Sequence, residues 1–120
     1  MSYTGHCNCE SVNVTLPRQP ANSVLCHCDS CKRAGGAFSV NYFISEDDMT
    51  VKDPTTALKV YEDKKTASGN VIGRHFCSNC GSPIFTTSPK FPGKAFLKAT
   101  LFDKVSPRDS EVFSNRRLEL

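Results

Sequence analysis

No run of apolar residues in this 120-residue chain approaches the roughly 18 residues that a membrane-spanning helix requires. The first residues also lack the basic segment followed by an apolar segment that marks a secretory signal peptide. We therefore expect no membrane association and a location in the cytoplasm, with the nucleus open by diffusion to so small a chain.

Net charge is low, and the sequence contains no low-complexity tract and no internal repeat. The formal charge of +3 is too small to favour nucleic acid or an acidic membrane on electrostatic grounds alone. No basic run is interleaved with aromatic residues, as is typical of nucleic-acid-binding segments. We expect one domain over residues 1–120, a size at which a bound metal would add much to a modest core.

Helix signals are few, and most segments have the alternating or β-branched pattern of strands. Strands are predicted over residues 11–16, 38–44, 49–52, 57–61, 83–87 and 95–101, and a hairpin turn is predicted at Gly69-Asn70. The best helix signal covers residues 29–34, where Asp29 or Ser30 could cap the start. The sequence therefore predicts a mainly β fold, with these aromatic residues expected in its core: Phe38, Tyr42, Phe43, Phe76, Phe85 and Phe96.

Seven cysteines stand out against this ordinary composition. In a reducing compartment they are not expected to form a disulfide framework, and an odd number argues further against full pairing. They fall into three groups with the spacings C-x-C, C-x-C-x-x-C and C-x-x-C: Cys7 and Cys9; Cys26, Cys28 and Cys31; Cys77 and Cys80. Such groups in an intracellular protein indicate metal binding.

Each spacing has a geometric reason. Residues i and i+2 of an extended segment point the same way, so Cys7 and Cys9 can reach one ion. A C-x-x-C turn brings two sulfurs to the same side of a tetrahedral metal. Gly81, which follows Cys80, permits the left-handed backbone that such a turn often needs. The middle group combines both devices and can bind an ion by itself.

The spacings favour a division of the cysteines into four and three. The outer pairs on one ion would form a closed, structural site that links distant parts of the chain. The middle group would leave a fourth position for water or substrate, which is the catalytic pattern. Thiolates favour zinc over hard cations, and iron also fits four sulfurs. Another division stays open, for example Cys26, Cys28, Cys77 and Cys80 on one ion.

Three histidines lie beside these cysteines: His6, His27 and His75. Any of them could close the three-cysteine site, but an isolated histidine is more often packed or exposed than bound to metal. His27 lies between two candidate ligands on an extended run, so its side chain should point away from their ion. It could still support the ligands through a hydrogen bond.

The motifs and their order resemble the family of glutathione-dependent formaldehyde-activating enzymes, which includes the centromere protein V-like proteins. The family's G-x-C-x-C segment matches residues 5–9, and its C-H-C-x-x-C segment matches residues 26–31, with basic residues after it. Its R-x-F-C-x-x-C-G segment matches residues 74–81, and residues 98–103 resemble its small-residue, Leu, Asp segment. The resemblance covers about residues 5–103, and the C-terminal tryptophan of many members is missing.

This resemblance implies an Mss4-like fold of mixed β-sheets with two cysteine-ligated zinc ions and little helix. It implies a structural zinc bound by Cys7, Cys9, Cys77 and Cys80. It also implies a second, catalytic zinc bound by Cys26, Cys28 and Cys31. The family's named reaction joins glutathione and formaldehyde into S-hydroxymethylglutathione, which is a carbon–sulfur lyase reaction in reverse.

We therefore expect a zinc-dependent carbon–sulfur lyase-type enzyme. Its expected substrate is an adduct of glutathione, or another thiol, with formaldehyde or another small carbonyl compound. Three basic residues beside candidate ligands could bind the carboxylates of glutathione, although each also fits an ordinary solvated surface: Lys32, Arg33 and Arg74. Three polar residues are candidates for moving a proton: His27, Asp29 and Ser30.

Two alternatives to this enzyme stay open at the level of sequence. One is a non-catalytic zinc-binding module for protein or nucleic-acid interaction, a role that zinc-ribbon-like knuckles often serve. The other is a relative that keeps both metals and has no activity. The complete middle cysteine group argues against the second alternative.

Overall fold

The computed structural model describes residues 2–120 as two β-sheets with one α-helix and three short 3-10 turns. A large sheet has the strand order β10-β3-β4-β9-β8-β7-β6, and a small sheet has the order β1-β2-β5. The strands of the small sheet are β1 (Tyr3–His6), β2 (Asn13–Leu16) and β5 (Thr50–Lys52). Those of the large sheet are β3 (Ser23–Cys26), β4 (Ser39–Ser45), β6 (Leu58–Asp63), β7 (Ile72–Cys77), β8 (Pro83–Thr87), β9 (Lys94–Lys98) and β10 (Arg108–Val112). This mainly β architecture confirms the predicted fold class.

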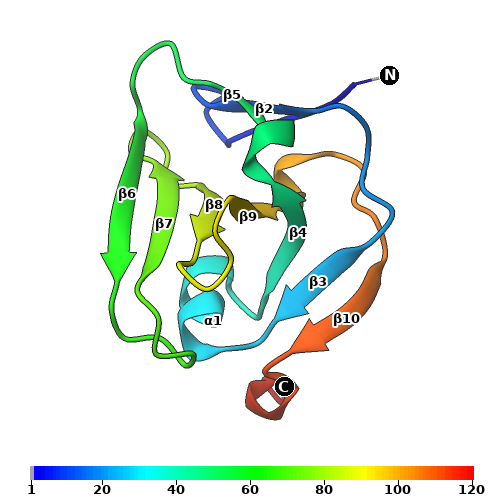
Figure 1. Cartoon of the computed structure of the whole chain (residues 1–120), viewed down its shortest axis with the longest axis vertical. Coiled ribbons are helices and arrows are strands. Elements are labelled where there is room, and N and C mark those ends of the chain that lie inside the picture. Colours follow the sequence, from blue (N-terminus) through cyan, green and yellow to red (C-terminus); the bar gives the residue numbers. More distant parts are fainter. Residues whose placement is uncertain (1) are drawn as a thin grey trace.

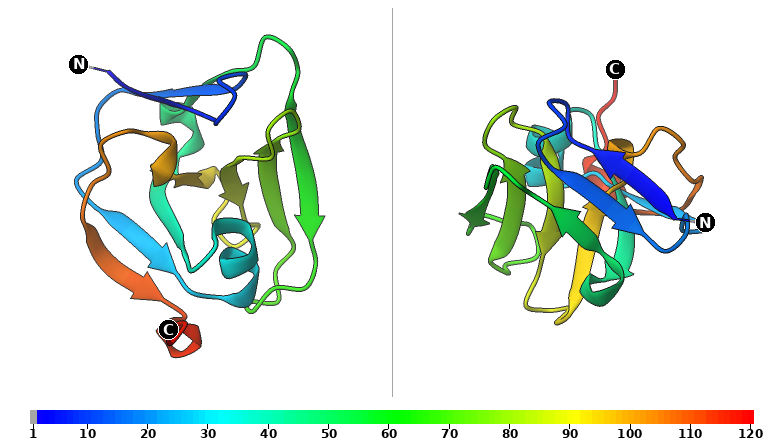
Figure 2. Two further views of the ribbon diagram at one scale, coloured as in Figure 1. Left: turned by 180° about the vertical axis from the view of Figure 1, so that it is seen from behind. Right: turned by 90° about the horizontal axis from the view of Figure 1, so that it is seen from above.

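The large sheet curls around the single helix, α1 (Asp29–Gly35), which lies between β7 and β3 when viewed from either side (Figures 1 and 2). The small sheet lies at the end of the molecule away from α1, and the N-terminal segment is at that end. The C-terminal segment follows β10 and lies at the opposite end (Figure 1).

The hydrophobic core lies between the small sheet and one face of the large sheet. Val12, Val14 and Leu16 are almost fully buried, as their alternation predicted, and they belong to one cluster with Tyr42 and Leu97. Because side chains alternate along a strand, the neighbours of Leu97 in β9 point to the other face of the large sheet. That second face carries the buried polar residues Ser39, Asn41 and Lys98, and it positions the second of the two sites described below.

Several elements differ from the sequence prediction. Four strands were not predicted, namely β1, β3, β7 and β10, and two of them have mostly polar or half-exposed residues without clear alternation: β7 and β10. The predicted strand over 95–101 ends at Lys98, because Ala99–Leu101 form a 3-10 turn. The turn at Gly69 is present, but residues 64–71 form a longer loop between β6 and β7 without flanking strands there. Of the predicted core aromatics, Phe38 and Phe43 are 37% and 45% exposed.

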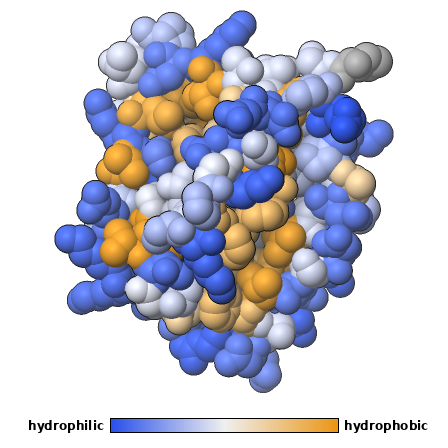
Figure 3. All heavy atoms as spheres, viewed as in Figure 1, coloured by the Kyte–Doolittle hydropathy of each residue, from blue (hydrophilic) through white to orange (hydrophobic). Residues whose placement is uncertain are grey.

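The surface facing the viewer in Figure 3 is mainly hydrophilic, with apolar patches between charged side chains. On the second face of the large sheet, the exposed side chain of Phe43 contacts Phe96 and Phe91, with ring centroids 4.9 Å and 5.4 Å away. Within residues 2–120, no helix combines the length and apolar character needed to cross a membrane.

Gly5 of β1 provides a test of how closely the small sheet approaches the 3-10 turn Ala99–Leu101 that follows β9. A Cβ atom at this position would lie 2.5 Å from the carbonyl oxygen of Leu101 and 2.8 Å from a ring carbon of Phe102. We expect Gly5→Ala to lower the free energy of unfolding by about 2 kcal/mol, because backbone must move to relieve the overlap. Urea unfolding monitored by circular dichroism measures this change.

Gly35→Ala is the matched control, since its new Cβ would meet only the Cβ of Ser39 at 3.6 Å, an ordinary contact. Equal unfolding midpoints for the two variants would contradict the close approach at Gly5.

Candidate metal centres

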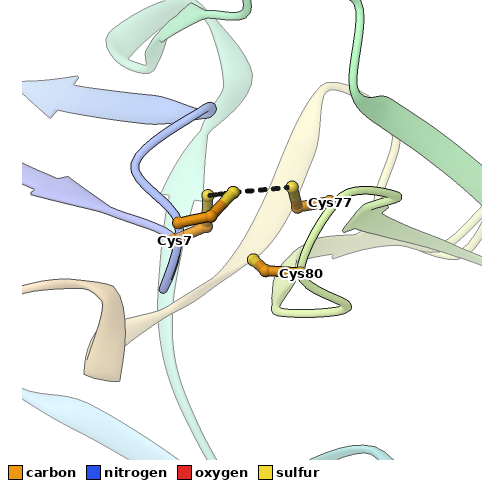
Figure 4. Close-up of side chains that lie close together, drawn as sticks. Cys7, Cys77 and Cys80 are labelled. Carbon is orange, nitrogen blue, oxygen red and sulfur yellow. Dashed lines mark hydrogen bonds between the residues drawn. The ribbon is translucent and has the colours of Figure 1, made fainter.

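Four cysteines that are far apart in sequence meet at the junction of the two sheets. Cys7 and Cys9 lie in the turn after β1, Cys77 ends β7, and Cys80 lies in the turn that leads to β8 (Figure 4). The Sγ atom of Cys9 is 3.7 Å from the Sγ of Cys7 and 3.7 Å from the Sγ of Cys77. All four sulfurs lie within 4.8 Å of one another.

These spacings fit a tetrahedral metal ion. Four sulfurs bound at about 2.3 Å to one tetrahedral ion are about 3.8 Å from each other. The turn between Cys77 and Gly81 is closed by a backbone hydrogen bond of 2.7 Å, and Gly81 has the left-handed backbone (φ 79°) that the sequence predicted. The four-cysteine group can therefore hold one tetrahedral ion with little movement of its sulfurs.

Hydrogen-bond donors around this group favour thiolates. The hydroxyl of Ser82 lies 3.2 Å from the Sγ of Cys80, and this hydrogen bond lowers the pKa of Cys80 to about 5. Hydrogen bonds with Ser11 and then Asn79 lower the pKa of Cys9. Burial raises the pKa of Cys77 to about 11. The group therefore retains some protons at neutral pH, and a bound cation would displace them.

The three middle cysteines form a separate group on the second face of the large sheet, at the start of α1. Cys26 ends β3, Cys28 precedes the helix and Cys31 lies in its first turn. Their sulfurs lie within 4.8 Å of one another, and less than a tenth of each residue is exposed. In the part of the chain that the structure describes, no histidine or carboxylate joins this group.

Cys28 also caps the helix. Its Sγ accepts a hydrogen bond of 3.3 Å from the backbone N–H of Cys31, so the prediction that Asp29 or Ser30 caps α1 was wrong. A side chain that accepts from the third residue of the helix satisfies one of the helix's unpaired N–H groups. The hydrogen bond that caps the helix therefore also fixes the position of the Cys28 sulfur as a candidate metal ligand.

The structure separates the cysteines into four and three, and not into the alternative group of Cys26, Cys28, Cys77 and Cys80. None of the three histidines closes the smaller group. His27 is buried and points to β10, where its Nε2 lies 2.7 Å from Glu111 Oε1, in agreement with the prediction that it points away. His75 stacks on Phe85, and His6 Nδ1 lies 2.8 Å from the carbonyl oxygen of Cys7.

Positive charge surrounds the three-cysteine group. A hydrogen bond with Cys26 lowers the pKa of Cys31 to about 5 against the opposing effect of burial, and the charges of Lys98 and Arg74 contribute to the lowering. Arg74 is fixed by Asp63, with 2.7 Å between Nε and Oδ2. The sequence analysis did not single out Lys98 as a site residue. The sequence context of Lys98 could have identified it, because this lysine lies in a predicted strand whose residues Ala95 and Leu97 belong to the core.

The other predicted substrate-binding and proton-transfer residues lie at the outer side of α1. Lys32 donates to the carbonyl oxygen of Arg116 at 2.7 Å and lies 3.3 Å from Asp29, which also pairs with the Arg116 guanidinium at 2.7 Å. Ser30 donates to the carbonyl oxygen of Lys65 at 3.3 Å, whereas Arg33 is exposed.

A cavity of about 370 Å³ opens beside these residues and is lined by Asp29, Ser30, Lys65, Thr66, Phe113 and Arg116, among others. A second cavity of about 410 Å³ is lined by His27 and Glu111, among others. Neither cavity is lined by a cysteine, and the first contains two of the predicted proton-transfer residues, Asp29 and Ser30.

Comparisons with known proteins agree with the cysteine pattern. The family model described as "Glutathione-dependent formaldehyde-activating enzyme" matches residues 2–116. A Halomonas elongata protein named "Putative glutathione-dependent formaldehyde-activating enzyme" is 28% identical over 92% of this chain and 72% of its own length. Proteins of the same name from Talaromyces marneffei and Penicillium rubens are 32% and 30% identical over 82% of this chain. The chain spans about half the length of these two fungal relatives, 52% and 51%.

A solved structure has the same fold. The crystal structure of a Rhodobacter sphaeroides protein superposes with a TM-score of 0.69 at 21% identity, and it covers 91% of this chain and 99% of its own. At this level of identity, the likeness concerns the fold alone.

Proposed function

The chain belongs to the family of glutathione-dependent formaldehyde-activating enzymes, and on this basis we propose that it is a zinc-dependent carbon–sulfur lyase-type enzyme. Its substrate would be an adduct of glutathione, or another thiol, with formaldehyde or another small carbonyl compound. The single observation that carries the proposal is the buried three-cysteine group, which is one ligand short of a closed tetrahedral site.

The two cysteine groups would have different roles. Cys7, Cys9, Cys77 and Cys80 would hold a structural zinc ion. The distance of 3.7 Å from the Cys9 sulfur to those of Cys7 and Cys77, and the grouping of all four sulfurs within 4.8 Å, support this assignment. Cys26, Cys28 and Cys31 would hold a second ion with an open position. A zinc ion held by these three cysteines would act as a Lewis acid and lower the pKa of a thiol bound at its open position.

The residues around the smaller group would bind the substrate and limit access of water. Of the three predicted basic residues, Arg33 is exposed, and its guanidinium makes no hydrogen bond or ion pair with residues 2–120, so it is free for a carboxylate of glutathione. Arg74 keeps its positive charge beside Cys31. Burial alone would lower the pKa of its guanidinium, but Asp63 and the negative charge of the cysteines raise this pKa by more. Lys32 would bind a substrate carboxylate only after its ammonium group left the Arg116 carbonyl oxygen.

Proton transfer would fall to a group at the start of α1. Hydrogen bonds from Arg116 and Lys32 lower the pKa of Asp29, so this side chain is a carboxylate at neutral pH but a weaker base than an unpaired aspartate. His27 is held by Glu111 through its Nε2 atom, and Ser30 is held by the Lys65 carbonyl. Each of the three candidates would therefore have to leave its present partner before it moved a proton.

The proposal is tested by the loss of free formaldehyde in the presence of glutathione and the zinc-loaded protein. We expect the protein to accelerate this loss above the spontaneous reaction of the two compounds. S-methylglutathione, which has the same carboxylates and no free thiol, is the matched control and should show no acceleration. Equal rates with and without protein would contradict the enzyme assignment for this substrate pair and favour a non-catalytic zinc module.

A further inference from the structure

Lys98 is a buried lysine without an acidic partner. Only 6% of the residue is exposed, and no ion pair joins it to a carboxylate in the described range 2–120. Its Nζ donates to the hydroxyl of Ser39 at 2.6 Å and to Oδ1 of Asn41 at 2.9 Å. Both acceptors are neutral, so the hydrogen bonds solvate the ammonium group but do not balance its charge.

The strand register places this amine beside the three-cysteine group. Lys98 of β9 lies opposite Asn41 of β4, and Ser39, two residues along β4, lies opposite Cys26 of β3. Residues two apart on a strand share a face, so the amine that bonds Ser39 reaches the same side of the sheet as Cys26. The helix that begins after Cys28 and contains Cys31 contacts β4.

A buried charge is costly unless an opposite charge lies close to it. Burial lowers the pKa of Lys98, and negative charge on Cys31 and on the other two cysteines of the group opposes this lowering. Conversely, three thiolates around one divalent cation carry a net charge of −1, which would increase to −2 with a thiolate as fourth ligand. The lysine and the cysteine group therefore each supply the charge that the other requires.

We propose that Lys98 is a positioning residue that neutralises the three-cysteine metal centre and makes it prefer an anionic thiolate over a neutral molecule as its fourth ligand. The inference rests on the proposed function in one respect, namely that the three cysteines bind a divalent metal. It does not depend on which thiol or carbonyl compound reacts there.

The test uses binding of small ligands to the full chain loaded with Co²⁺, whose absorption bands report on the ligands of each ion. The probes are 2-mercaptoethanol, which binds as a thiolate, and imidazole, which binds as a neutral molecule. In Lys98→Gln, the amide keeps a donor for Ser39 and Asn41 but removes the charge. We expect this variant to bind 2-mercaptoethanol at least about tenfold more weakly than the wild type and imidazole with unchanged affinity.

Three further variants make the result specific. Asn41→Asp places a carboxylate beside the unchanged lysine and should weaken thiol binding in the same way, which keeps the test valid even if Lys98→Gln folds poorly. Lys98→Arg retains the charge and should preserve the preference for thiol. Lys94→Gln changes an exposed lysine on the same face of β9 and should have no effect.

Equal thiol affinity in the wild type, Lys98→Gln and Asn41→Asp would overturn the proposal. A parallel loss of thiol and imidazole binding in these two variants would also overturn it, because such a loss would indicate that Lys98 has only a structural role. Failure of the wild type to bind a second Co²⁺ would overturn it through its premise. A wild type that binds thiol selectively but does not turn over formaldehyde would refute the proposed substrate and leave the role of Lys98 intact.

Discussion

Replacement of Cys77 by serine is expected to leave most of the chain unfolded at room temperature. Cys77 is fully buried in the main core, and its sulfur lies 3.7 Å from that of Cys9, so one ion would join the turn after β1 to the end of β7. Structural zinc sites of this kind contribute about 10–16 kcal/mol in small domains. This contribution is as large as the about 5–15 kcal/mol by which a whole domain is usually stable.

Far-ultraviolet circular dichroism and thermal unfolding measure this effect. We expect Cys77→Ser to lack a cooperative transition in the presence of zinc, and the wild type to lose its transition when a strong chelator removes both ions. A cooperative transition for Cys77→Ser at the wild-type midpoint would show that the four-cysteine group does not hold the fold together.

Replacement of Cys28 by serine should have the opposite outcome: an intact fold and an inactive protein. Serine is a good helix cap, so its hydroxyl can accept the N–H of Cys31 as the thiol does now. It cannot supply a thiolate, and the second metal ion would lose one of its three protein ligands. Changes outside the ligand shell already cost about 10–100-fold in metal affinity or activity, so we expect a fall in kcat/KM of at least about 100-fold.

Native mass spectrometry and the formaldehyde assay measure these two consequences. Cys28→Ser should retain one zinc ion of two and a thermal transition close to that of the wild type. Cys28→Ala removes the cap as well and should be less stable than Cys28→Ser by about 1 kcal/mol. Two bound zinc ions together with a wild-type rate in Cys28→Ser would refute the role of the middle group.

The two variants together separate the cysteine groups by their effects. Loss of an outer cysteine should remove the fold and, with it, every other property. Loss of a middle cysteine should remove one ion and the activity alone. A reversal of this pattern would exchange the structural and chemical roles that the closed and open sets of ligands suggest.

Local spacing determined the parts of this protein that depend only on neighbouring residues. The C-x-C and C-x-x-C intervals predicted which sulfurs within each group point the same way, because two or three residues of extended chain or turn fix the direction of their side chains. The alternation of Val12, Val14 and Leu16 likewise predicted a buried face, and the helix after residue 28 was found where its signals were. These features needed no knowledge of distant segments. Which groups share an ion was left open by the spacings and was decided by the fold.

Other local patterns gave the wrong result because distant residues decided the outcome. Asp29 is an ordinary helix cap by sequence, but its carboxylate pairs with Arg116, and Cys28 caps the helix instead. Phe38 and Phe43 have the composition of a core strand, yet Phe38 precedes β4 and Phe43 lies on the face of the large sheet opposite the main core, and they are 37% and 45% exposed. The polar strand β10 exists because it pairs in parallel with β3, a partner about 85 residues earlier in the chain.

Only the tertiary structure decided the surroundings of the open cysteine group. The sequence places Lys98 about 70 residues from Cys26 and gives no reason to connect them. The pairing of β3 with β4 and of β4 with β9 brings the two residues to one face of the large sheet, because register determines which side chains share a surface. The sequence alone therefore determined which cysteines can bind metal, whereas strand register determined which charges surround them.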